Sequence, residues 1–156
     1  MYTLVRSYLK TAIAFLAVGL TIGGYLIAQR EFRGVAPDEY LVSAHTHALF
    51  VGFVMMMIMG VALWLFPRPE KTDAQYSPRL AAVAYWLITI GTVGRVGGEV
   101  MRSSLFDMNI SALWLRATIV AAGFLQGIAI GVFFFTMWTR IRPVGSKVRE
   151  ARGERF

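Results

Sequence analysis

The sequence contains no cysteine, only two histidines and only nine carboxylates among its 156 residues. Without cysteine there is no disulfide framework, no thiolate metal site and no thiol nucleophile. Charged residues make up 16% of the chain and hydrophobic residues 56%, which is too apolar for an ordinary water-soluble domain. Few side chains are therefore available for chemistry, and the composition indicates a membrane protein.

Four long apolar runs are present, at about residues 11–28, 41–66, 80–100 and 110–138. Each run is long enough, as a helix, to cross a hydrocarbon core of about 30 Å. Helix is expected because a chain in lipid must satisfy its own backbone hydrogen bonds. The sequence therefore predicts an all-α integral membrane protein, a four-helix bundle over residues 1–139 with a basic tail over 140–156.

The first apolar run has two interpretations, because Arg6 and Lys10 precede it as they would precede the core of a signal peptide. No convincing cleavage site of small residues follows Ala28. We therefore interpret this run as a membrane anchor and the first helix of the bundle.

Lysine and arginine counts predict the orientation. Three short connections make neighbouring helices antiparallel, in an up-down-up-down order. The N-terminal segment, the second connection and the tail together carry eleven basic residues, whereas the first and third connections carry three. By the positive-inside rule both termini are cytoplasmic, in the inner (plasma) membrane of the cell. The net charge of +7 then reflects topology and contact with anionic lipid, and no folded module supports nucleic-acid binding.

Two strips of glycine mark helix faces for close packing. Gly123, Gly127 and Gly131 repeat at four-residue spacing in the fourth run, and Gly91, Gly94 and Gly98 form a similar strip in the third. We favour packing within the chain over a subunit interface for both strips.

Five ionisable residues fall within or at the edges of the apolar runs, all toward the non-cytoplasmic side: His45, His47, Arg95, Glu99 and Arg116. Charges in membrane spans usually face a bundle interior, a cavity or a partner. Simpler explanations exist, since Arg95 and Glu99 have the i, i+4 spacing of a pair and Arg116 is able to extend to the interface. Because all five lie toward the non-cytoplasmic side, we favour a common anionic ligand.

The two histidines are two residues apart, so on a helix they point to different faces and do not chelate one ion together. One of them is expected to face the core. Leu49, Gly52 and Met56 follow His45 on the same face, with Met59 and Gly60 beyond them. An imidazole for iron, a glycine for close approach and apolar side chains for the macrocycle form a wall of a haem pocket.

The stretch SAHTHALFVGFVMMMIMGVALWLFP, Ser43 to Pro67, resembles the second helix of subunit I of the haem-copper oxidase superfamily. In that family a histidine after a small residue binds the low-spin haem, a glycine follows fifteen residues later, and a proline closes the helix. The matching positions here are Ala44, His45, Gly60 and Pro67. The resemblance covers about the first four of the family's twelve helices and implies that His45 is an axial ligand of haem b.

The resemblance also shows what this chain lacks. The family's second haem ligand and its copper ligands are histidines from later helices, and this chain has only His45 and His47. By itself it cannot assemble the centre that reduces dioxygen or nitric oxide, so we favour a role without turnover. The second ligand then comes from another protomer, a methionine or a partner protein, or that position is vacant.

Three hypotheses follow. The first is a haem b protein for electron transfer or gas sensing, with His45 on the iron and Arg95, Arg102 or Arg116 pairing with the haem propionates. A homo-oligomer fits this hypothesis, a dimer sharing one haem before a trimer, together with a redox partner protein. The second is a cofactor-free accessory or assembly subunit. The third is a copper-handling protein that uses both histidines and nearby methionines.

Overall fold

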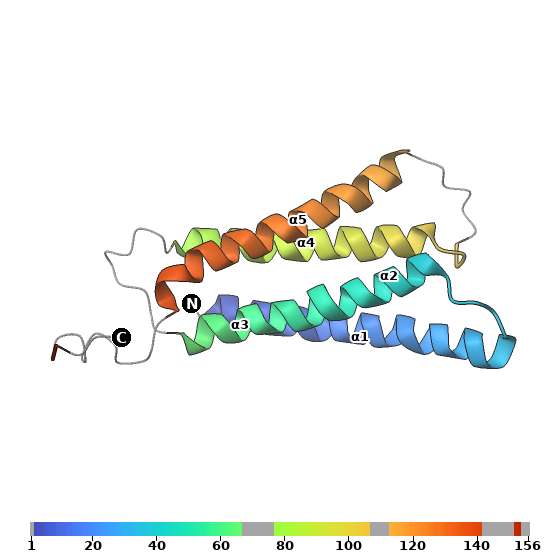
Figure 1. Cartoon of the computed structure of the whole chain (residues 1–156), viewed down its shortest axis with the longest axis horizontal. Coiled ribbons are helices and arrows are strands. Elements are labelled where there is room, and N and C mark those ends of the chain that lie inside the picture. Colours follow the sequence, from blue (N-terminus) through green and yellow to red (C-terminus); the bar gives the residue numbers. More distant parts are fainter. Residues whose placement is uncertain (1, 67–76, 107–112, 142–151, 154–156) are drawn as a thin grey trace.

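A computed structural model describes residues 2–66, 77–106, 113–141 and 152–153 of the chain (Figure 1). Most of the described residues are helical, and no strand occurs among them. The elements are α1 (Tyr2–Arg33), α2 (Glu39–His47), the π-helix η1 (Ala48–Met55), α3 (Met56–Leu65), α4 (Pro78–Arg102), α5 (Leu113–Met137) and the 3₁₀ turn η2 (Trp138–Arg140). The predicted all-α class is confirmed.

Four helical segments are long and apolar enough to cross a membrane: Thr3–Arg33, Glu39–Leu65, Pro78–Arg102 and Leu113–Arg140. At most a third of the most apolar stretch of each is buried inside the molecule, so most of the apolar surface faces outward. This is the surface that a lipid solvent would cover. The four membrane-spanning helices predicted from the sequence are confirmed, and α1 begins well before the predicted start at residue 11.

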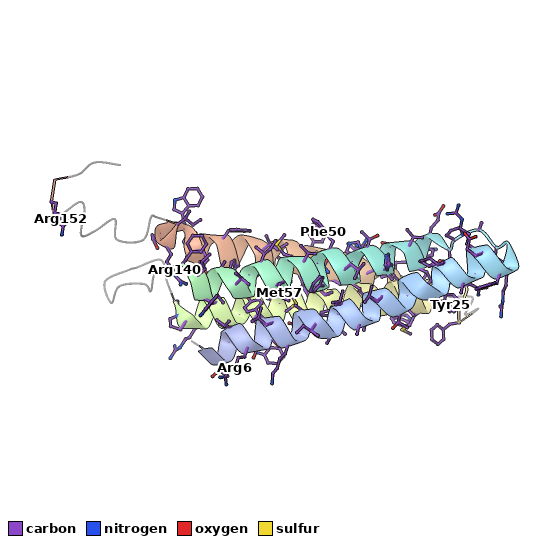
Figure 2. The ribbon with its side chains drawn as sticks, turned by 90° about the horizontal axis from the view of Figure 1, so that it is seen from below. Arg6, Tyr25, Phe50, Met57, Arg140 and Arg152 are labelled. Atoms are coloured by element: carbon purple, nitrogen blue, oxygen red, sulfur yellow. The ribbon has the colours of Figure 1, made fainter. Side chains whose placement is uncertain are left out.

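Polar contacts define the two ends of the molecule. At one end, which we call the Asp38 end, Asp38 before α2 accepts a hydrogen bond from the backbone of Ser104, just after α4. At the other, the Arg140 end, the Arg140 side chain donates to the backbone carbonyls of Leu63 and Phe66 at the close of α3. The start of α1 lies at the Arg140 end as well (Figure 1; Figure 2 labels Arg6 and Arg140 there).

The predicted boundary of the tail needs one refinement. Arg140, which the sequence analysis placed first in the tail, is only 1% exposed and bonds the end of α3. It therefore belongs to the helical body. Asp107 and Asn109 precede the last apolar run and are candidates from the sequence for the N-cap of its helix, but both lie outside the described residues.

The packed core lies toward the Arg140 end, where all four helical segments meet. The Tyr8 ring of α1 makes edge contacts with Tyr85 of α4, at a centroid distance of 5.0 Å, and with Phe133 of α5, at 6.1 Å. Met56 and Met59 fill the space beside them and are fully buried. Toward the Asp38 end the buried apolar cluster is smaller, with Ala44 and Ala48 against Val96 of α4.

The two glycine strips behave differently. In α4, a side chain at Gly91 would meet the backbone oxygen of Ala122 at 2.9 Å, and one at Gly98 would meet Ile119 at 2.7 Å. Packing within the chain is therefore confirmed for α4. In α5, nothing lies within 4 Å of the space beside Gly127 or Gly131, so the prediction of packing within the chain is wrong for those two residues.

The second membrane segment contains a π-helix, which the sequence did not predict. Residues Ala48–Met55 have the wider π turn, with α-helix before and after. Such segments are rare and occur often at functional sites. Because a wider turn needs more residues, the buried positions here follow one another every four residues, at Ala44, Ala48, Gly52 and Met56.

Asp38 caps α2, and its charge is expected to stabilise the fold. Its Oδ1 accepts from the backbone N–H of Tyr40 at 2.9 Å and of Leu41 at 3.2 Å, and its Oδ2 accepts from Ser104 at 2.9 Å. Burial opposes the charged carboxylate, but these hydrogen bonds outweigh it and lower the pKa of Asp38.

We expect Asp38→Ala to lower the free energy of unfolding by about 0.5–2 kcal/mol at neutral pH, as for other lost N-caps. Because the folded-state pKa is lowered, this contribution is complete above the unfolded value of about 3.9 and is lost as the pH falls through the folded value. Melting followed by circular dichroism in detergent, across the acid range, measures the effect. The gap between wild type and Asp38→Ala should close in acid, whereas the neutral cap in Asp38→Asn should not titrate. A gap that is constant with pH would contradict a stabilising charge.

Candidate functional site

The His45 side chain of α2 lies against α1. Its Nδ1 is 2.8 Å from the backbone oxygen of Gly19. A carbonyl oxygen only accepts hydrogen bonds, so Nδ1 donates this bond, and in the neutral imidazole Nε2 is the nitrogen with the free lone pair. Histidines that bind metals are usually held in this way, with the second ring nitrogen donating to a carbonyl or carboxylate that fixes the ring.

Glycines of α1 make room for this ring. A side-chain carbon at Gly23 would lie 2.6 Å from Cε1 of His45 and 3.0 Å from its Nδ1. One turn earlier, a side chain at Gly19 would clash with the Leu49 side chain. Gly19 and Gly23 therefore form a floor on α1 that receives side chains of the second segment, and Gly23 is what lets the imidazole lie so close.

The histidine borders a groove of about 480 Å³ between α1 and α2. Its walls are mainly apolar, with Leu20 and Ile27 from α1 and Val42 from α2. Arg30, in the last turn of α1, lines the same groove and is the one cationic side chain among its lining residues. The groove thus combines the His45 imidazole, apolar walls and the positive charge of Arg30 at the Asp38 end.

Gly52 and Met56 lie farther along the same segment, but no open space lies beside them. A side-chain carbon at Gly52 would lie 2.5 Å from Cγ of Phe15, so the Phe15 ring of α1 fills the room that the sequence analysis assigned to a macrocycle. Met56 is fully buried in the core near Tyr8. The flat ring packed against Gly52 is therefore a phenylalanine of this chain.

His47 points to a different side from His45, as predicted. Its Nδ1 lies 3.0 Å from the backbone oxygen of Ser43 and 3.8 Å from Oε2 of Glu99 on α4. Glu99 also accepts from Ser43 Oγ at 2.7 Å and from Arg95 Nε at 2.6 Å. The predicted i, i+4 pairing of Arg95 with Glu99 is thereby confirmed. The pair is on α4 and meets the face of α2 that carries Ser43 and His47.

The other two predicted propionate partners lie elsewhere. The Arg102 guanidinium stacks over the Tyr40 ring, 4.4 Å from its centroid, and Arg116 is exposed on α5. The structure therefore does not bring the five ionisable residues together: His45 faces α1, while His47, Arg95 and Glu99 meet between α2 and α4.

Gly19, Gly23 and Arg30 were not among the residues predicted from the sequence. The signal for the glycines was present, since Gly19 and Gly23 have the same four-residue spacing as the strip in α5. No group of three or more histidine, cysteine or acidic side chains that could hold a metal occurs in the described ranges.

These features define a multi-pass membrane protein with a histidine held on a glycine floor. The sequence model for cytochrome c and quinol oxidase polypeptide I matches residues 3–150, and the chain belongs to this family. The resemblance seen in the second segment is thereby confirmed.

One curated relative is the probable cytochrome c oxidase subunit 1-alpha of Streptomyces avermitilis. It is 29% identical over 147 residues, which cover 85% of this chain. The chain spans only 24% of the length of that relative. No solved structure gives a significant match.

Proposed function

We propose that this chain is a membrane haem protein in which His45 is an axial ligand of haem b and which transfers electrons or senses a gas. The observation that carries this proposal is the His45 ring itself. Gly19 holds its Nδ1, Gly23 leaves room for the ring, and Nε2 is the nitrogen available to iron. When bound, haem supplies a one-electron couple and an iron atom to which a small gas can bind.

The residues around His45 fit this group. Apolar side chains of α1 and α2 suit the macrocycle, and Arg30 is placed to form a charge-assisted bond with a propionate. Arg30 takes this role in place of Arg95, Arg102 and Arg116, which lie on other faces. Gly52 and Met56 support the packing of α1 on this segment and are not part of the proposed haem contact.

The groove is open away from α1 and α2, so this chain supplies one side of the site. We propose that a second copy supplies the other, with His45 of each protomer on one iron. In a symmetric dimer the same surface of both protomers forms the interface. The two copies of His45 therefore lie opposite each other, as ligation of one iron by two histidines requires. A trimer, a ligand from a redox partner protein and a vacant sixth position are the other arrangements, and a ratio other than one haem per two chains would favour them over the shared haem.

We further propose the orientation in the membrane. The Arg140 end, where α1 begins and α5 closes, faces the cytoplasm, because the N-terminal segment, the second connection and the tail carry eleven basic residues and the other two connections carry three. The helices then alternate in direction, and His45 lies toward the outer side of the inner membrane.

The test is a reduced-minus-oxidised spectrum of the purified full chain, with haem and protein measured separately. We expect the bands of a low-spin b-type haem and one haem per two chains. One haem per chain would contradict sharing but keep ligation by His45. A colourless protein that retains copper after dialysis would overturn the proposal in favour of copper handling. A colourless protein without metal would overturn it in favour of a cofactor-free accessory subunit.

A further inference from the structure

A buried carboxylate of α4 holds α2 from the side opposite to His45. Glu99 has a side chain only 3% exposed. One oxygen, Oε1, accepts from Ser43 Oγ at 2.7 Å and from Arg95 Nε at 2.6 Å. The other, Oε2, lies 3.8 Å from His47 Nδ1 and has no hydrogen-bond partner.

The residues that meet Glu99 flank His45 in the sequence. Ser43 and His47 are four residues apart, so they share one face of α2, and His45 between them points about 200° away. On that other face its Nδ1 meets the oxygen of Gly19. The two contacts therefore oppose each other across α2, and a rotation of the helix about its axis would break both.

The apolar contacts at this level do little to fix such a rotation. Ala44 and Ala48 pack on Val96, and these short side chains form a smooth surface. A buried carboxylate is different, because it must keep its ionic and hydrogen-bonded partners to offset the loss of water. The hydrogen bonds of Glu99 are therefore directional. Of the two α2 side chains that meet Glu99, Ser43 has the shorter contact, at 2.7 Å against 3.8 Å for His47.

We propose that Glu99 is a positioning residue that sets the rotation of α2 and thereby keeps the His45 ring on Gly19 and Gly23. The importance of the ring position for iron rests on the proposed function, but the position itself is measurable without haem. Glu99 does not touch the proposed ligand, and it acts through Ser43 and the α2 backbone.

The first experiment observes the ring in the haem-free full chain. The chain has only two histidines, so ¹⁵N-histidine labelling gives two side-chain spectra in detergent, and His47→Ala assigns them. In wild type we expect His45 to show the protonated Nδ1 and unprotonated Nε2 resonances of one tautomer. In Glu99→Leu and Ser43→Ala the separation between these resonances should collapse toward that of free imidazole.

Two variants separate positioning from charge and from misfolding. Glu99→Gln keeps an oxygen for Ser43 but removes the charge, so it should retain the wild-type His45 spectrum. Arg95→Leu combined with Glu99→Leu leaves no unpaired charge, so it should fold and still lose the single tautomer. Glu39→Gln, at an exposed carboxylate in the first turn of α2, is the matched control and should change nothing.

The second experiment uses the haem-loaded chain. We expect the electron paramagnetic resonance g values of the low-spin haem to shift in Glu99→Leu and Ser43→Ala and to return to those of wild type in Glu99→Gln. The proposal is overturned if folded Glu99→Leu and Ser43→Ala both keep the wild-type His45 spectrum, or if Glu99→Gln behaves like Glu99→Leu. If wild type binds no haem, the proposed function fails, while the haem-free experiment still decides the role of Glu99.

Discussion

His45→Ala is expected to remove the haem from the purified protein. The substitution deletes the nitrogen that would bind iron, and no other histidine faces the groove between α1 and α2. We expect the Soret band to fall to background and the haem-to-protein ratio, measured as the pyridine haemochrome, to fall with it. The chain should still fold, because His45 is only partly buried and its ring borders an open groove.

His47→Ala is the matched variant for this experiment. It removes the same side chain two residues away, from the face of α2 that meets α4. We expect its Soret band to remain, and melting followed by circular dichroism should show both variants folded. Equal haem content in His45→Ala and wild type would rule out His45 as the ligand. Loss of haem from His47→Ala alone would move the site to the α4 side of α2.

The sequence predicted the helices well because membrane spans depend on local composition. A run of apolar residues long enough to cross lipid must be helical, whatever it packs against. His45 was also accessible from sequence, because the histidine, Gly60 and Pro67 lie on one segment at fixed spacing. The i, i+4 pairing of Arg95 and Glu99 was accessible for the same reason.

The remaining features depend on contacts between segments. Nothing local shows that Phe15 of α1 fills the space beside Gly52, since this depends on how α1 and the π-helix align. Ser43 likewise gains its role only because its face of α2 meets Glu99. The expectation that five ionisable residues share one anionic ligand was based on their similar depth in the membrane. Similar depth does not place residues on the same side of a helix.

Gly23→Ala is expected to have the second largest effect, although it adds a single methyl group. The new carbon would lie 2.6 Å from Cε1 of His45, which is closer than carbon atoms approach one another. The imidazole is the end of a side chain and the helix backbone is not, so the ring should move and α1 should stay. The bond from Nδ1 to Gly19 would then be lost. Loss of a group that orients a metal-binding histidine typically costs about 10–100-fold in affinity, and we expect haem affinity to fall by that amount.

Gly131→Ala provides the matched control for this substitution. It makes the same change in helix propensity in α5, away from the groove beside His45 and at a position where nothing lies within 4 Å of the added carbon. Haem titration of the two variants, with ¹⁵N-histidine spectra of the haem-free forms, compares them directly. Gly131→Ala should match wild type in both measurements, whereas Gly23→Ala should bind haem weakly and lose the single His45 tautomer. Wild-type haem affinity in Gly23→Ala would mean that the iron ligand does not rest on α1, because no imidazole in the position described here can accommodate that methyl group.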